Sequence, residues 1–324
     1  MSSPSASPVP VSLFHHFEPM APLMLLALLG YLLAVSGRWP KSVSDALASF
    51  TFAIAVPALL FRLMSDPSRL PPFEPRILVA FFGGCLVTFL VGRAVSRWIY
   101  RLDGVSQSVF ALGGVFSNNV LLGVPLAKAM LGEAALPTVA LVLVFNTLTL
   151  WTLVTASVEW ARHGELSVQG FKTTTKKVVT TPVVAAVLSG AVVGTLGIPI
   201  PGFVDEPLRL VSQSATPLAL IVVGMGLSEY GVRDGWPIGL GITTLKLAVQ
   251  PLVVLGLAHL LGLPRLESQT VVLLASLSVG VNVYLMSRHF GVLQAPVASS
   301  LVLSTALSSL TAPAVLAIVP FVRG

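Results

Sequence analysis

The sequence contains few charged residues. Of its 324 residues only 10% are charged, whereas 55% are hydrophobic. Soluble domains carry about 25% charged residues, so this chain has too few to cover a surface exposed to water. The scarcity excludes an ordinary soluble enzyme or binding domain and predicts an integral membrane protein.

Long polar segments are scarce as well, because apolar windows recur along the whole chain. Each window is long enough to cross a hydrocarbon core of about 30 Å as a helix. Barrel strands would alternate apolar and polar residues, and a run such as LMLLALLG does not alternate. The sequence predicts an all-α membrane protein with ten transmembrane helices, at 19–36, 43–64, 76–99, 106–131, 135–160, 178–197, 206–229, 236–261, 268–290 and 294–320.

Side chains for catalysis or metal binding are also missing. The single cysteine, Cys85, excludes an intramolecular disulfide and is interpreted as a small apolar residue. His15 and His16 have no further ligand nearby, so the sequence predicts no metal site. All 13 carboxylates lie in loops or near span ends, and no nucleophile motif or phosphate loop is present. We therefore predict that the protein is not an enzyme and needs no cofactor.

The basic residues are spread over short loops. With ten spans, one side of the membrane holds seven of the 19 Lys and Arg residues and the other holds eleven, with Lys246 in mid-span. The richer side is predicted to be cytoplasmic, which places both termini outside the cytoplasm. This rule explains the net charge of +6 better than nucleic-acid binding does.

A polar connection at 161–177 divides the chain into halves. We expect a disordered tail at 1–18, a first five-helix repeat at 19–160, and a second at 178–324. Residues that fix backbone shape recur at offsets of 160 or 159: Pro22 and Pro182, Gly30 and Gly190, Gly37 and Gly197, Pro57 and Pro217, Gly132 and Gly291, and Pro137 and Pro296. An odd number of spans per repeat inverts the second copy, as in secondary transporters. Chance matching in a chain rich in Gly and Pro is the alternative.

The fourth and ninth predicted spans each contain a polar interruption. FSNNVLLGVP in the fourth includes Ser117, Asn118, Asn119, Gly123 and Pro125, and SLSVGVNVY in the ninth includes Gly280 and Asn282. Proline removes a backbone donor and glycine weakens a helix, so both spans are predicted to break. Non-helical backbone at this depth must be enclosed or line a polar cavity. Half-helix N-termini and Asn amides suit an anion, although the asparagines could instead bond helices together.

Lys246 is the one clear charge in mid-span. Placing a lysine there costs on the order of 3 kcal/mol, so it marks a functional position by default. Gln250, one turn on, shares its helix face. Lys246 is predicted to neutralise an anionic substrate or to replace a coupling cation; alternatively, it holds the unwound carbonyls of a neighbouring helix. Asn146 and Thr305 match at offset 159 and are predicted to edge the same cavity.

The segments FSNNVLLGVPLAKAMLG, TPLALIVVGMGL and LKLAVQPLVV resemble the auxin efflux carrier family, whose bacterial members include carboxylate transporters. The resemblance covers the chain from about residue 19. It implies a fold like that of the bile-acid/sodium symporters, with spans 4 and 9 crossing at their breaks. It further implies a scaffold of spans 1, 2, 6 and 7, an elevator-like transport domain of the other spans, and a homodimer joined through the scaffold.

In plant members of this family an Asn in each crossover contacts the substrate carboxylate. The matching positions here are Asn118 or Asn119 and Asn282, whereas Gly280 stands where the plant pattern has proline. The long cytoplasmic loop of the plant members is absent, so auxin is not the expected substrate.

Together these observations predict a secondary transporter for a small organic anion. The expected substrate is a mono- or dicarboxylate such as malonate, moved across the cell inner membrane by alternating access. The predicted substrate-binding residues are Asn118, Asn119, Asn282, Lys246, Ser117, Gly280, Asn146 and Gln250, and the predicted helix breaks are Gly123, Pro125 and Gly280. The alternatives are an exporter of amino acids or amphipathic metabolites, a channel, which would need a continuous polar stripe, or a membrane sensor.

Overall fold

The chain forms helices throughout the part that the structure describes. The computed structural model describes residues 21–66, 74–163, 182–228 and 235–318, and every named element in these ranges is a helix. Within them the only strand-like pairing is an isolated antiparallel bridge between Ser117 and Val279. The all-α prediction is confirmed. The predicted tail at 1–18 and most of the connection at 161–177 lie outside the described residues.

Six helices among the described residues are long and apolar enough to cross a membrane. They are α3–η2–α4 (Lys41–Phe50, Thr51–Ala55, Val56–Ser65), α5 (Pro75–Trp98), η5–α8 (Glu133–Ala135, Leu136–His163), α11 (Gly202–Leu227), α12–η6–α13 (Trp236–Thr244, Leu245–Val249, Gln250–Leu260) and α16 (Gln294–Ile318). Two shorter apolar helices, α2 (Ala21–Val35) and α10 (Pro182–Thr195), lie at the first and sixth predicted spans. These lengths are the ones expected of helices that span a membrane.

The fourth and ninth predicted spans each consist of two helical halves. The fourth comprises α6 (Gly104–Gly113) and η4–α7 (Asn119–Gly123, Val124–Leu131). The ninth comprises α14 (Arg265–Ala275) and α15 (Val281–Phe290). Extended backbone joins the halves in both spans, so neither span is a continuous helix.

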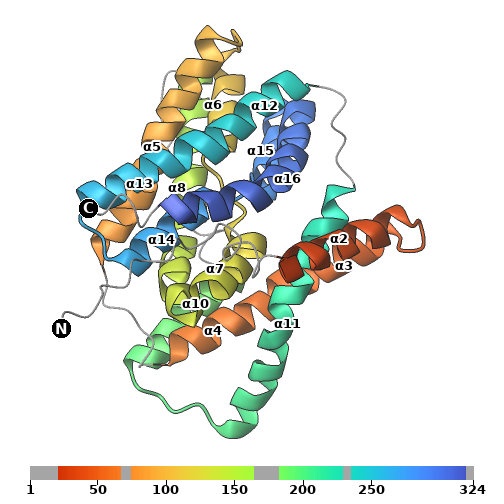
Figure 1. Cartoon of the computed structure of the whole chain (residues 1–324), viewed down its shortest axis with the longest axis vertical. Coiled ribbons are helices and arrows are strands. Elements are labelled where there is room, and N and C mark those ends of the chain that lie inside the picture. Colours follow the sequence, from red (N-terminus) through yellow and green to blue (C-terminus); the bar gives the residue numbers. More distant parts are fainter. Residues whose placement is uncertain (1–20, 67–73, 164–181, 229–234, 319–324) are drawn as a thin grey trace, which may run out of the picture.

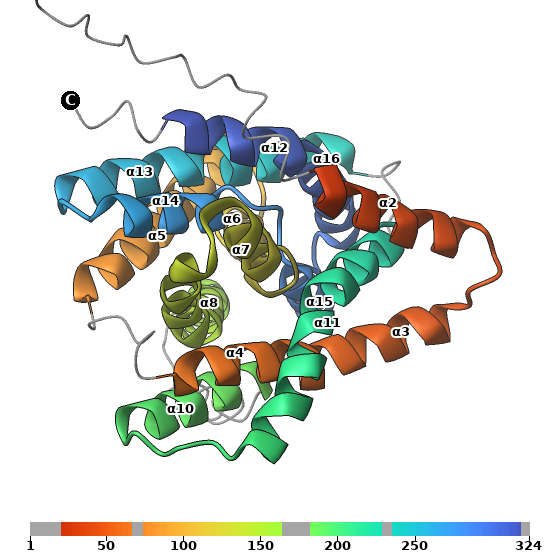
Figure 2. The same cartoon turned by 60° about the horizontal axis from the view of Figure 1, so that its bottom comes forward.

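The helices form two groups. One contains α2, α3, α4, α10 and α11, in which α10 packs against α4 and α11 packs against α2. The other contains α5, α6 and α12 to α16, in which α5 packs against α6 and α13, and α12 packs against α16. Figure 1 shows the first group below and to the right of the second, and Figure 2 shows α7 and α8 between them.

Matched glycines of the two halves permit close helix packing in the first group. A Cβ on Gly30 of α2 would lie 2.1 Å from the carbonyl oxygen of Ile221 on α11. A Cβ on Gly190 of α10 would lie 2.6 Å from the carbonyl oxygen of Phe61 on α4. Gly190 lies 160 positions after Gly30, and Ile221 lies 160 positions after Phe61. Equivalent residues of the two halves therefore make reciprocal contacts that any side chain would obstruct.

Matched glycines also share an unusual backbone conformation. The φ angles of Gly37 and Gly197 are 68° and 62°, and those of Gly132 and Gly291 are 82° and 75°. Residues with side chains rarely adopt such positive values, which explains why glycine stands at these turns in both halves.

Several contacts join connections that ten alternating spans would place on one side of the membrane. The Tyr100 hydroxyl, after predicted span 3, donates to the carbonyl of Pro237, at the start of span 8, at 3.1 Å. The Arg162 guanidinium, after span 5, lies 5.7 Å from the ring centre of Phe290, at the end of span 9. On the opposite side, Arg76 donates to the carbonyl of Leu261 at 3.3 Å.

Candidate functional site

The extended segments of the two divided spans cross and hydrogen-bond to each other. The backbone N–H of Asn118 donates to the carbonyl of Ser278 at 2.9 Å, and that of Gly280 donates to the carbonyl of Phe116 at 2.7 Å. These bonds flank the antiparallel bridge between Ser117 and Val279. The crossing thus satisfies backbone groups that have no helical partner at this point.

The first break lies earlier in the chain than the glycine and proline that suggested it. Its extended backbone precedes Asn119, where a wide π-helical turn begins. Gly123 ends that turn, and Pro125 lies in the first turn of α7. A proline lacks the N–H that a regular helix needs at this place, and here it directly follows the π-helical turn, inside the second half-helix instead of at the extended break. Gly280, by contrast, lies at the second break, immediately before α15.

The two adjacent asparagines have different surroundings. Asn119 is only 2% exposed, and its Nδ2 donates to Oδ1 of Asn146 on α8 at 3.4 Å. Asn118 is half-buried and caps the second half of its span without a side-chain cap bond. Asn282 is half-buried in the first turn of α15. Asn118 and Asn282 are therefore partly exposed, whereas Asn119 contacts a neighbouring helix.

Three side-chain oxygens at the crossing have unused hydrogen-bonding capacity. Ser117 Oγ, Asn119 Oδ1 and Ser278 Oγ are buried and have no hydrogen-bond partner. Buried polar atoms are normally paired, so a cluster of unpaired ones is characteristic of a site that receives a ligand or water. Nearby, Ser304 Oγ of α16 accepts from the N–H of Val279 at 3.0 Å. Thr305, which was predicted to edge the cavity, donates to Leu301 of its own helix at 2.7 Å.

Lys246 and Gln250 are fully buried beside both breaks. Lys246 Nζ donates to the carbonyl of Ala275 at 2.5 Å and to Oε1 of Gln250 at 2.6 Å. Gln250 Nε2 donates to the carbonyl of Val115 at 3.1 Å and to Sγ of Cys85 at 3.3 Å. The two side chains thus bond to both divided spans, and these contacts match the alternative role considered for Lys246, that of holding unwound carbonyls.

The sequence did not identify the carbonyls of Val115 and Ala275 or the thiol of Cys85 as part of this arrangement. Val115 and Ala275 are separated by 160 positions, and Cys85 and Lys246 by 161, so the four residues are close to equivalent in the two halves. The offset between the two halves could have paired these positions. The residue types could not, because a thiol and an ammonium group share no recognisable motif.

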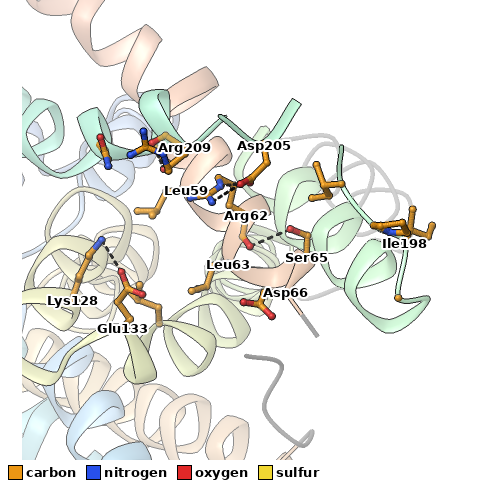
Figure 3. A pocket seen from close by; sticks show the side chains of 16 residues that line it. Leu59, Arg62, Leu63, Ser65, Asp66, Lys128, Glu133, Ile198, Asp205 and Arg209 are labelled. Atoms are coloured by element: carbon orange, nitrogen blue, oxygen red, sulfur yellow. Dashed lines mark hydrogen bonds and ion pairs between the residues drawn. The ribbon is translucent and has the colours of Figure 1, made fainter. Parts of the chain in front are cut away.

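A second polar region is a pocket of about 560 Å³ between the first helix group and the helices α7 and η5–α8. Its charged lining residues are Arg62, Asp66, Lys128, Glu133, Asp205 and Arg209. Figure 3 shows Arg62 paired with Asp205, and Lys128 paired with Glu133 across the pocket from them. The paired atoms lie 2.6 and 3.3 Å apart, respectively. None of the predicted site residues lines this pocket, which combines loops far apart in the sequence.

The described ranges contain no group of three or more His, Cys, Asp or Glu side chains that could hold a metal ion. His15 and His16 lie outside those ranges.

Comparison with known proteins gives the class of the chain. Residues 15–316 match the family described as "Membrane transport protein". A protein of Rhizobium meliloti described as "Putative malonate transporter" is 26% identical over 297 residues, which cover 90% of this chain and 91% of the relative. Uncharacterized transporters of Methanocaldococcus jannaschii and Methanothermobacter thermautotrophicus are 23% and 24% identical, covering 89% and 91% of this chain and 94% and 96% of their own lengths. The family and these relatives are named as transporters, not as enzymes. The chain therefore belongs to this family of membrane transport proteins, which confirms its resemblance to the auxin efflux carriers.

Proposed function

We propose that this transporter moves a small organic anion, a mono- or dicarboxylate such as malonate, across the cell inner membrane by elevator-type alternating access. The observation that carries the proposal is the crossing of two broken spans, with the second half-helices starting at Asn119 and Val281. The first N–H groups of a helix have no intrahelical acceptor and carry partial positive charge. Two such ends beside one crossing favour a carboxylate.

The side chains at these ends add uncharged donors. Asn118 and Asn282 are half-buried at the starts of the second half-helices, where their amide groups can donate to carboxylate oxygens. Asn119 donates a hydrogen bond to Asn146 on α8 and so holds the first break in position. Ser117 and Gly280 contribute the extended backbone, and Ser117 also brings an unpaired hydroxyl. Lys246 and Gln250 support the first half-helices, so we assign them an indirect role in binding.

The arrangement of the helices supports two inverted five-helix repeats. Reciprocal packing at Gly30 and Gly190 relates the halves in the way that an inverted repeat requires. Spans 1, 2, 6 and 7, which form the first helix group, would be the scaffold, and spans 3, 4, 5, 8, 9 and 10 the transport domain. The loops after spans 2, 4 and 6 all contribute to the charged pocket, as expected if they share one side of the membrane.

The pocket is proposed as the entrance used by the anion. It lies between the scaffold, which supplies Arg62 and Arg209, and the transport domain, which supplies Lys128. Its basic residues can attract an anion, whereas their acidic partners prevent tight binding there. Because the positive-inside rule places both termini and these loops outside the cytoplasm, the pocket would open to the outer side. Exposed apolar side chains on the scaffold, such as Leu25, Leu32 and Leu210, suit either lipid or a second copy of the chain.

Coupling is proposed to rely on the membrane potential or on a proton carried with the substrate. All 13 carboxylates lie in loops or near span ends, so none is placed to carry a proton through the crossing. A dicarboxylate that crosses with one proton would carry less charge through the low-dielectric region.

Uptake into liposomes tests the proposal. Purified protein is reconstituted, and the entry of radiolabelled malonate is measured under an imposed membrane potential, with empty vesicles as the blank. Unlabelled succinate, acetate, glutamate and leucine compete in parallel reactions. We expect saturable malonate uptake that succinate and acetate inhibit and leucine does not. Uptake no faster than in empty vesicles, or competition by amino acids alone, would reject the carboxylate substrate.

A further inference from the structure

The first half-helices of the crossing end beside one buried pair of side chains. α6 and α14 end at Gly113 and Ala275, and the last carbonyls of such helices carry partial negative charge. The carbonyl of Ala275 accepts from Lys246, and that of Val115, just past the end of α6, accepts from Gln250. The N-terminal ends of the second half-helices form the proposed anion site, whereas these C-terminal ends suit a cation.

Lys246 has no acidic partner in this position. It is 0% exposed, and among the described residues it forms no ion pair with a carboxylate. Its two hydrogen-bond acceptors are neutral oxygens, a backbone carbonyl and a side-chain amide. Neutral carbonyl oxygens at unwound helix ends are the ligands that secondary transporters use for Na⁺. The ammonium group of Lys246 therefore occupies the chemical environment of a small monovalent cation.

The charge also orients the polar group at the other break. Because Oε1 of Gln250 accepts from Lys246, its Nε2 is directed towards Val115 and Cys85. At the equivalent position of the first half, Cys85 Sγ lies 4.0 Å from the carbonyl of Val115 and brings no positive charge. One cation thus organises both breaks. Lys246 lies in a π-helical turn, Leu245–Val249, of the kind that often occurs at functional sites.

We propose that Lys246 is a tethered counter-cation that fills a latent monovalent-cation site formed by the carbonyl of Ala275 and Oε1 of Gln250. The wild-type carrier accordingly binds no free Na⁺ or K⁺ at the crossing. Removal of the side chain opens the site to a small cation such as Na⁺, K⁺ or methylammonium. The consequence for transport, independence from sodium, rests on the proposed function, whereas the cation site itself does not.

Thermal unfolding of the purified, detergent-solubilised protein tests this proposal without any knowledge of the substrate. The melting temperature is measured in choline, sodium, potassium and methylammonium chlorides at equal ionic strength, for wild type, Lys246→Ala, Lys246→Met and Lys41→Ala. A ligand that binds only the folded state raises its apparent stability. We expect the wild type to melt at one temperature in all four salts. In Lys246→Ala at least one small cation should raise the melting temperature saturably by roughly 2–4 °C over choline.

The two other variants are matched controls. Lys246→Met keeps most of the side-chain volume and so fills the site without charge, and Lys41→Ala removes an exposed lysine at the start of α3. Neither should respond to a particular cation. If Lys246→Ala does not fold in choline, it is expressed and purified in each salt, and recovery of monodisperse protein in a small cation replaces the melting shift.

Two results would overturn the proposal. One is a sodium- or potassium-specific rise in the wild type, which would show that a free cation already binds. The other is a Lys246→Ala protein that gains neither stability nor recovery in any small cation. Failure of malonate uptake would refute the proposed substrate but leave these melting temperatures, and the cation site, unaffected.

Discussion

The two breaks of the crossing share a backbone plan but differ in their chemistry. The first break has Asn118 at the start of its second half-helix and presents its Val115 carbonyl to the neutral amide of Gln250. The second has Gly280 at the corresponding start and presents its Ala275 carbonyl to the ammonium group of Lys246. The first break therefore has an asparagine where the second has a glycine, and the second alone contacts a charged side chain.

This difference shows which features of a duplicated fold are set by geometry and which are free to diverge. Reciprocal backbone bonds of Asn118 and Gly280 are needed to join the extended segments, so they occur in both halves. Under the proposed function the side chains around those bonds contact the anion, and an asymmetric ligand does not need the same group twice. Divergence at the side chains with retention of the backbone bonds is the expected outcome.

Removing the charge of Lys246 should produce the largest difference in stability between changes at the two breaks. Lys246→Met leaves the Ala275 carbonyl and Oε1 of Gln250 buried without a donor, and each unpaired group costs about 1–3 kcal/mol. Gln250→Met keeps the hydrogen bond from Lys246 to Ala275, and the main group left without a donor is the carbonyl of Val115. We expect the first variant to lose more stability than the second, measured by thermal and denaturant unfolding. Equal losses would show that the charge has no special role at the second break.

Replacing each adjacent asparagine should reveal which one contacts the substrate. Asn118→Ala removes an accessible donor, and a hydrogen bond to a charged group contributes about 1.5–3 kcal/mol, so the affinity for the anion should fall roughly 10- to 100-fold. Asn119→Ala removes the bond to Asn146 and should lower the melting temperature more than the affinity. Uptake kinetics and unfolding of the two variants give the comparison, which fails if Asn119→Ala weakens substrate binding more.

A methyl group at Gly280 should disturb the crossing itself. An added Cβ would lie 3.1 Å from both Cδ1 of Phe116 and the carbonyl oxygen of Ser117, so the crossing segments would have to separate slightly. We expect Gly280→Ala to lose about 1–2 kcal/mol of stability, together with transport rate. Gly256→Ala on α13 is the matched control, because no atom lies within 4 Å of its added Cβ. Similar behaviour of the two variants in unfolding experiments would contradict the close approach.

The smallest expected effect concerns the start of α6, the half-helix that precedes the first break. Asp103 caps α6 by accepting from the N–H groups of Val105 and Ser106, whereas Pro264 precedes α14 without a side-chain cap. Asp103→Ala should cost about 1 kcal/mol. The hydrogen bond from the Ser106 hydroxyl lowers the pKa of Asp103 below its usual value. The stabilisation should therefore be present above about pH 4 and be lost as the pH falls through the folded-state pKa. Unfolding of both proteins across this pH range should converge in acid; a constant gap would refute the cap.

Much of the fold could be predicted from the sequence because membrane spans depend on length and composition alone. The apolar windows predicted an all-helical membrane protein, and the polar interruptions predicted that two spans would be divided. The position of the first break was less accessible, because Gly123 and Pro125 indicated an interruption, whereas in the structure a π-helical turn accommodates them inside the second half-helix.

The surroundings of the site residues depend on contacts between distant segments. Lys246 was prominent as a charge in an apolar span, yet its acceptor at Ala275 is a backbone carbonyl that any residue could supply. Nothing in the sequence of adjacent asparagines distinguishes the one that faces Asn146 from the one that remains accessible. The charged pocket was missed because its lining comes from three separate loops and the helices beside them.

Equilibrium binding most directly tests whether the crossing, not the charged pocket, holds the anion. Radiolabelled malonate, or the anion that competes best in the uptake panel, is titrated onto purified wild type, Asn118→Ala and Arg62→Ala. The crossing site predicts that Asn118→Ala weakens binding roughly 10-fold or more, whereas Arg62→Ala, altered only in the pocket, retains it within about twofold. Retention of binding by Asn118→Ala together with its loss in Arg62→Ala would contradict the crossing as the substrate site.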